Sequence, residues 1–226
     1  MRTSGRQAYL MGYGLTDEQQ MFQETVRRLA TTKVAPRAAE IDVTGEFPWD
    51  IVDLFRENGL IGVGMPESLG GGGADLLTFC LAVEEVARAC ATSSLIIAAQ
   101  HLGAMPILVA ATPEQQARFI PAIASGEKLS AFALTEPEAG SDAGGTRTRA
   151  IRDGEHYRIT GSKVFITNGG IAKTIVVFAS TAPEKGVRGI IKCYRAVVDP
   201  YLYTLYFYED GPMGMKARAK SKRSKR

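Results

Sequence analysis

The segment FALTEPEAGSD, residues 132–142, stands where the sequence changes from helical to strand patterns. Within it, a short apolar run is followed by three carboxylates, two hydroxyls, a proline and a glycine. Such residues after a buried strand favour an exposed turn whose backbone N–H and C=O groups can bind a ligand. By itself the segment predicts either a hairpin end or a ligand-binding loop, and hairpin ends are the more common of the two.

Upstream of this segment the sequence predicts helices. Thr16 and Gln19 match a capping box at the start of a helix expected to end near Thr32. Pro48 favours the start of a second, shorter helix, and Gly59 favours its end because glycine tolerates the left-handed conformation that follows a helix.

Three more helices are expected before the strands begin. The first has an apolar face with Glu85 among the polar positions around it. The second, residues 93–111, is interpreted as buried core, because polar residues and a proline interrupt it too often for a membrane span. The third begins at a second capping box, at Thr112, and ends near Gly126. The apolar face of the first of these helices comprises Leu76, Phe79, Cys80 and Val83.

Strand patterns follow Gly126. Residues 128–135 predict one strand, residues 147–168 two strands around Asp153-Gly154, and residues 174–181 a buried strand rich in β-branched residues. Because helices are followed by strands along the chain, the fold class is expected to be α+β.

A second polar cluster, VFITNGG at residues 164–170, has the same design as the first: an apolar run, then Thr167, Asn168 and two glycines. Two such strand ends can face one planar ligand, with hydroxyls and amides bonding its edge and Phe165 packing on its face. Glu136 and Glu138 are interpreted as solvated turn residues without an acid–base role.

Composition restricts the class of protein further. The 226 residues are 45% apolar, enough for a packed core. Three cysteines at spacings that match no zinc or redox motif indicate reduced thiols, and two histidines leave little room for a metal site, so no metal is expected. The first 14 residues lack the apolar core of a secretory signal, which favours a cytoplasmic location without a membrane partner.

Taken in order, these segments resemble the acyl-CoA dehydrogenase family over about residues 13–189. The resemblance rests on five stretches: GLTDEQQMFQETVRRLA, GLIGVGMPESLGGGG, LGAMPILVAATPEQQARFIPAIASGE, FALTEPEAGSDAGGTRTRA and ITGSKVFITNGG. It implies a helical N-terminal domain over residues 1–127 and a truncated antiparallel β-barrel domain over residues 128–189. Residues 190–226 then form an aberrant tail, rich first in tyrosine and then in basic residues.

The resemblance also implies a function. Members of the family use FAD to oxidise the Cα–Cβ bond of an acyl-CoA thioester to a trans-2-enoyl-CoA, pass the electrons to an electron-transfer flavoprotein, and form homotetramers. The residues whose positions would bind the flavin are Phe132, Ala133, Leu134, Thr135, Gly140, Ser141, Phe165, Ile166 and Thr167. Of these, Thr135 would bond the isoalloxazine edge and Ser141 would also touch the CoA part of the substrate.

The family's catalytic base is a glutamate of a C-terminal helical domain, and neither that domain nor the helices that build the tetramer have a counterpart in this sequence. No catalytic residue is therefore expected within it. Neither Glu136 nor Glu138 matches the family's base.

Two other interpretations concern residues 190–226. Five of the eight tyrosines lie within residues 194–208, and seven of the 27 basic residues lie within residues 216–226. The first interpretation is out-of-frame translation, which would make the chain an inactive fragment with at most a residual flavin and acyl-CoA half-site. The second is a basic-tailed nucleic-acid-binding protein, disfavoured because a terminal charge run is usually only solvated.

Overall fold

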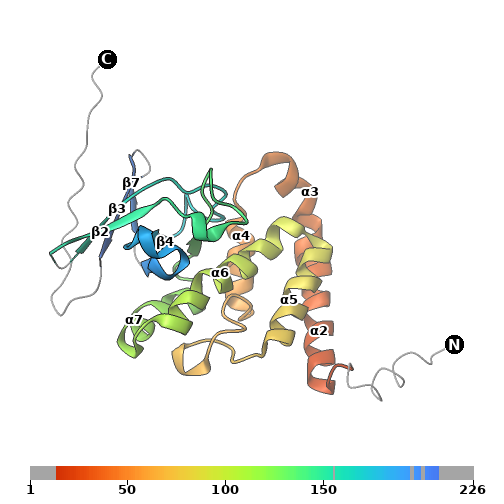
Figure 1. The fold of residues 1–226 in the computed structure, drawn as a ribbon. Helices are drawn as coiled ribbons and strands as arrows, with labels where there is room; N and C mark the ends of the chain where they lie inside the picture. Colours follow the sequence, from red (N-terminus) through yellow and green to blue (C-terminus); the bar gives the residue numbers. More distant parts are fainter. Residues whose placement is uncertain (1–13, 155, 194–195, 200–201, 209–226) are drawn as a thin grey trace. The chain divides into compact units, whose positions relative to one another are not determined.

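The computed structural model describes residues 14–154, 156–193, 196–199 and 202–208. The chain divides into two compact units (Figure 1). One comprises Met1–Glu67 and Gly71–Ala98, and the other comprises Ser68–Gly70 and Ala99–Arg226. The α+β class is confirmed, because helices precede a sheet along the chain. The domain boundaries expected at residues 127 and 189 stay predictions.

The first unit is helical. Its elements are α2 (Asp17–Leu29), the π-helix η1 (Ala30–Val34), α3 (Ala35–Thr44), α4 (Trp49–Glu57) and α5 (Leu76–Ala89). A short 3-10 helix, η2 (Glu67–Leu69), and the long helix α6 (Ala91–Ala110) each cross the boundary between the units.

The first predicted helix does not end near Thr32, because η1 continues it into α3. A proline breaks an α-helix when its ring meets the carbonyl four residues earlier. Here the wider π turn precedes Pro36, which occupies the first turn of α3, where a missing N–H needs no partner. The continuous helical segment ends instead at Gly45, whose φ of 65° is the left-handed conformation typical of a glycine cap.

The predicted apolar face of α5 is only partly buried, because Leu76 and Cys80 are exposed. Glu85, predicted to be a polar surface position, is instead buried. Its carboxylate accepts two hydrogen bonds from the Arg27 guanidinium of α2, Nε to Oε2 at 2.9 Å and Nη2 to Oε1 at 2.7 Å. These bonds lower the pKa of Glu85 below its ordinary value. The pair joins α2 to α5, with the Glu85 side chain 1% exposed and the Arg27 side chain 48% exposed. This polar position therefore faces a neighbouring helix, which periodicity cannot reveal.

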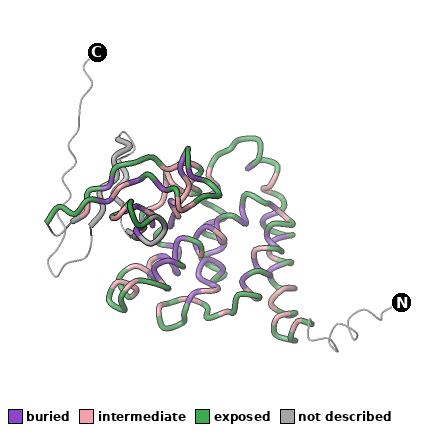
Figure 2. The backbone as a smooth tube through the Cα atoms, viewed as in Figure 1, coloured by how far each residue is buried: buried purple, intermediate pink, exposed green. Residues whose placement is uncertain are grey.

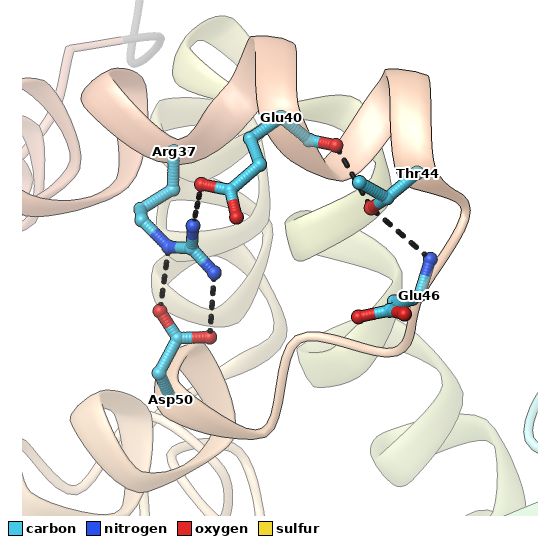
Figure 3. Close-up of polar contacts among 5 residues, drawn as sticks. All are labelled: Arg37, Glu40, Thr44, Glu46 and Asp50. Atoms are coloured by element: carbon cyan, nitrogen blue, oxygen red, sulfur yellow. Dashed lines mark hydrogen bonds and ion pairs between the residues drawn. The ribbon is translucent and has the colours of Figure 1, made fainter.

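An exposed ion-pair group connects α3 to α4 (Figure 3). Arg37 donates to both carboxylate oxygens of Asp50, with Nε 2.7 Å from Oδ2, and to Glu40 on its own helix. The Thr44 hydroxyl donates to the Glu40 carbonyl at 2.9 Å and accepts from the Glu46 N–H at 3.3 Å. Exposed ion pairs contribute little to the free energy of folding, because water screens them, so the main effect of this group is to fix the turn between α3 and α4.

The second unit combines the end of α6 and α7 (Pro113–Ala124) with a seven-stranded sheet. The capping box at Thr112 is confirmed at the start of α7. The strands are β1 (Ser130–Ala133), β2 (Arg149–Asp153), β3 (His156–Thr160), β4 (Thr174–Ser180), β5 (Ile190–Cys193), β6 (Ala196–Asp199) and β7 (Leu202–Tyr208). Two 3-10 helices, η3 (Ala143–Gly145) and η4 (Pro183–Gly189), lie between them.

The sheet is mixed, so the prediction of a purely antiparallel domain was wrong. The strand order is β1-β4-β2-β3-β7-β6, with β5 also paired to β4. β1 runs parallel to β4, with Ser130 opposite Thr174, and β2 meets β4 in parallel at Arg149 and Ser180. Parallel neighbours need a long connection, and residues 134–173, which contain the β2–β3 hairpin, provide it.

The hairpin around Asp153-Gly154 is confirmed, but its second strand ends at Thr160 and does not continue to residue 168. Phe165 and Asn168 have φ values of 58° and 64°, and left-handed residues cannot continue a strand. VFITNGG is consequently a loop. Beyond residue 189, β5, β6 and β7 are strands, whereas the basic residues 216–226 lie outside the described part of the chain.

The core of the sheet combines small and β-branched side chains. Figure 2 colours the backbone by burial, with buried residues in purple. The core consists of Ala131, Ala133, Ala150, Ile159, Ile175, Val177 and Ala179. Helix α6 meets the length and composition of a membrane span, contrary to the expectation from sequence. Because 56% of its apolar 18-residue stretch is buried within the protein, α6 also has the burial of a core helix.

Gln100 of α6 fixes the start of β1. It is fully buried, and its amide Nε2 donates to the carbonyls of Ile123 and Lys128, both at 2.8 Å. Its Oε1 accepts from the Ser130 N–H at 2.8 Å. Gly103, one turn further along α6, packs so closely that a Cβ there would lie 2.4 Å from the Ser130 hydroxyl oxygen. One amide group thus joins the end of α7, its following turn and the first residue of β1.

We expect Gln100→Leu to lower the free energy of unfolding by about 3 kcal/mol, because each buried backbone group left without a partner costs roughly 1–3 kcal/mol. Urea denaturation measures the loss. The matched control is Gln116→Leu, which removes bonds of 3.1 Å to the Leu108 and Ala111 carbonyls at a partly buried helix end that water can reach. Equal losses in the two variants would contradict the role of Gln100.

Candidate functional site

The loops that follow β1 and β3 meet in the second unit. The Val164 N–H donates to the Thr135 carbonyl at 3.0 Å, and the Lys163 Nζ donates to the Leu134 carbonyl at 2.7 Å. The structure therefore brings together the two polar clusters that were singled out in the sequence. They meet through backbone groups and one lysine.

Glu136 lies at the centre of this junction. Its Oε1 accepts from Lys163 Nζ at 2.8 Å and from the Thr148 N–H at 3.0 Å, and its Oε2 accepts from the Arg147 N–H at 2.6 Å. The side chains of Glu136 and Lys163 are only 2% and 5% exposed. One carboxylate thus connects the end of β1, the segment entering β2 and the loop after β3.

The surroundings shift the pKa of both groups. Burial by itself would raise the pKa of the Glu136 carboxyl, but the hydrogen bonds from Lys163, from Thr148 and from the Arg147 backbone N–H outweigh burial and lower it to about 2. Burial lowers the pKa of Lys163, and the Glu136 carboxylate opposes that shift. At neutral pH the junction is a buried ion pair.

The interpretation of Glu136 as a solvated turn residue was wrong, whereas Glu138 is exposed as expected. Lys163 was not predicted at all. A lysine directly before the apolar run VFI is the one local signal that could have indicated a buried charge. Its partner lies 27 positions earlier, so the sequence does not show the pairing.

Phe165 combines two unusual properties in one residue. Its backbone is left-handed, with φ at 58°, and the residue is 92% exposed. A bulky residue held in this conformation costs about 1–2 kcal/mol, and an exposed aromatic ring recovers none of it within the protein. Strain of this kind gathers at binding sites, so Phe165 indicates a ligand that packs on its ring.

Asn168 ends the same loop and anchors it to β1. It too has a left-handed backbone, which asparagine tolerates, and its Nδ2 donates to the Ser130 carbonyl at 3.2 Å. Its carbonyl accepts from the Ala172 N–H at 2.8 Å. The loop that carries Phe165 is therefore held at both ends.

The predicted flavin-binding residues fall into two groups. Ala133 is buried, Phe132 packs against Phe178 with ring centroids 4.8 Å apart, and Ile166 packs against the core of the sheet. The others are half-buried or exposed along the two loops: Leu134, Thr135, Gly140, Ser141, Phe165 and Thr167. Their individual roles stay predictions.

The groups presented by the two loops fit a flavin. An exposed aromatic face and hydroxyls on Thr135, Ser141 and Thr167 are the donors and the packing surface that a planar heteroaromatic ring requires. In the part of the chain that the structure describes, no group of three or more His, Cys, Asp or Glu residues could hold a metal ion.

Comparisons with known proteins agree with this organisation. Residues 16–127 match the model of the acyl-CoA dehydrogenase N-terminal domain, and residues 131–199 match that of the acyl-CoA dehydrogenase middle domain. The second match continues past residue 189, where the resemblance was expected to end.

Individual relatives give the same result. A probable acyl-CoA dehydrogenase of Bacillus subtilis is 46% identical over 190 residues, which are 84% of this chain and 50% of the relative. The butyryl-CoA dehydrogenase structure from Megasphaera elsdenii has a TM-score of 0.75 at 38% identity, covering 80% of this chain and 49% of that one. A glutaryl-CoA dehydrogenase of Mycobacterium smegmatis in complex with FADH2 has a TM-score of 0.73 at 25% identity, covering 86% of this chain and 52% of that one. The chain spans about half the length of these relatives.

We expect Phe165→Gly to weaken FAD binding about tenfold, since an aromatic contact contributes about 1 kcal/mol beyond apolar burial. The free energy of unfolding should stay within about 1 kcal/mol of wild type, because glycine adopts the left-handed conformation without strain. Flavin fluorescence titration and urea denaturation measure the two effects. Ile151→Ala, which truncates another exposed apolar side chain of the same unit, should change neither. A large loss of stability in Phe165→Gly would show that the ring has a packing role.

Acid should remove the stabilisation that Glu136 provides. Because its folded pKa of about 2 lies below the ordinary 4.5, the contribution is complete above about pH 5 and is lost as pH falls toward 2. The shift corresponds to on the order of 3 kcal/mol. In urea denaturation, the free energy of unfolding of wild type should exceed that of Glu136→Gln by a smaller amount at about pH 3 than at about pH 6. The control Glu138→Gln should show the same pH dependence of the free energy of unfolding as wild type. If the difference in this free energy between wild type and Glu136→Gln were the same at both pH values, the stabilising role of the Glu136 carboxylate would be contradicted.

Proposed function

The chain belongs to the acyl-CoA dehydrogenase family, and from that premise we propose that the loops after β1 and β3 bind FAD for the dehydrogenation of an acyl-CoA thioester. The observation that carries the proposal is Phe165, an exposed and strained aromatic residue directly after the backbone contact between Val164 and Thr135. A relative whose structure is described as a complex with FADH2 supports the choice of cofactor.

In this proposal Thr135 and Thr167 supply donors to the edge of the flavin, and Phe165 covers the ring from water. Bound FAD supplies the hydride acceptor for oxidation of the Cα–Cβ bond to a trans-2-enoyl-CoA. Donors already held in place stabilise charge that develops on a bound ring without having to reorganise. Ser141, exposed in the loop after β1, contributes to binding of the CoA part.

Glu136 is not the base that removes the α-proton. A carboxyl group with a pKa of about 2 is a weak base, and its oxygens already accept three hydrogen bonds. Glu136 therefore belongs to the support of the loops. On the basis of the family, we also propose that an electron-transfer flavoprotein accepts the electrons and that the protein assembles as a homotetramer.

The test is to purify the chain, add FAD, remove the excess, and record the absorbance and fluorescence of retained flavin. We expect the folded chain to retain flavin. A folded chain that retains none would overturn the proposal of an FAD site.

Anaerobic addition of butyryl-CoA to the flavin-loaded chain then tests the reaction. Bleaching of the flavin absorbance would support dehydrogenation by this chain. Retention of flavin without bleaching would limit the proposal to cofactor binding.

A further inference from the structure

We propose that Lys163 is a positioning residue: its ammonium group, paired with Glu136, holds the peptide unit between Leu134 and Thr135 against the loop that carries Phe165. This inference rests on the proposed binding of FAD by the two loops. It assigns a role to Lys163, a buried residue that the proposed function does not use.

The first argument is the geometry of the ammonium group. Lys163 Nζ donates to the Leu134 carbonyl at 2.7 Å and to Glu136 Oε1 at 2.8 Å. These acceptors lie on either side of Thr135 in the sequence. The Thr135 carbonyl accepts from the Val164 N–H at 3.0 Å. Backbone rotation at Thr135 would break at least one of these three contacts.

The second argument is that two consecutive residues, Lys163 and Val164, connect both loops of the candidate site. Lys163 and Val164 bind the loop after β1, and Phe165 follows them directly. A strained residue persists only where its surroundings fix it, and the contacts of Lys163 and Val164 supply that support on its N-terminal side. Loss of the ammonium group would release Thr135 and Phe165 together.

The third argument concerns the quality of the donor. The Leu134 carbonyl and the Thr135 N–H belong to one peptide unit. An ammonium bonded to the carbonyl polarises that unit and makes the N–H a stronger donor. A ligand with an acceptor-rich edge, such as the pyrimidine part of a flavin, gains from this arrangement.

Stability by itself gives a weaker reason for the pair. Replacement of a buried ion pair by apolar residues is often neutral or stabilising, because desolvation offsets the attraction between the charges. The pair instead selects one arrangement of three chain segments. At that junction Gly161 approaches Thr148 so closely that a Cβ would lie 2.2 Å from the Thr148 hydroxyl oxygen, which shows how tightly the segments are packed.

The experiment compares Lys163→Met with wild type as full chains, using Arg158→Met as the matched control. Arg158 belongs to the same sheet and pairs with Asp153 at 2.7 Å, but both side chains are more than 60% exposed. We expect FAD binding to weaken about tenfold or more in Lys163→Met, the scale of one lost hydrogen bond to a charged group, with an altered visible absorption band of the bound flavin. Arg158→Met should bind FAD as wild type does. Lys163→Arg, which keeps the charge and the donors, should lose less affinity than Lys163→Met.

Hydrogen exchange of the flavin-free chains separates this inference from the proposed function. The amides of Val164, Arg147 and Thr148 should exchange faster in Lys163→Met than in wild type and be unchanged in Arg158→Met. If wild type binds no FAD, the proposed function fails, and the exchange rates decide alone whether Lys163 holds the loops. A folded Lys163→Met with wild-type exchange rates or wild-type FAD affinity would overturn the inference. If Lys163→Met does not fold, Lys163→Gln is measured in its place, and wild-type behaviour of that variant would overturn the inference equally.

Discussion

A carboxylate can be buried only where donors surround it, and this constraint at Glu136 organises the candidate site. Lys163 and two backbone N–H groups provide the donors, and they come from three segments that are separate in the sequence. The end of β1, the entry to β2 and the loop after β3 are thereby brought to one point. Phe165 and Thr135 owe their positions to that junction.

β1 is the element on which this arrangement is built. Gln100 fixes its first residue from helix α6, and the Leu134 carbonyl just beyond its last residue is held by Lys163. Between these points β1 pairs in parallel with β4, so the strand cannot slide without loss of polar contacts at both ends. A strand of only four residues thus becomes a rigid support for a binding loop.

The strained backbone of Phe165 is explained by ligand binding and not by folding. An exposed ring with a left-handed backbone contributes nothing to the core, whereas the residues around it are fixed by hydrogen bonds. This pattern, a rigid support that presents a strained aromatic residue, is what a binding site for a planar cofactor requires. It agrees with membership of a family whose structures include a complex with FADH2.

The sequence by itself determined the features that depend on near neighbours: the capping boxes at Thr16 and Thr112, the hairpin at Asp153-Gly154, the order of helices before strands, and the polar turn after β1. Only the tertiary structure decided the parallel pairing of β1 with β4, the burial of Glu85 and Glu136, and the left-handed backbone of Phe165. The physical reason is the distance between partners along the chain. A cap bonds within four residues, whereas Glu85 pairs with a residue 58 positions away and Glu136 with one 27 positions away.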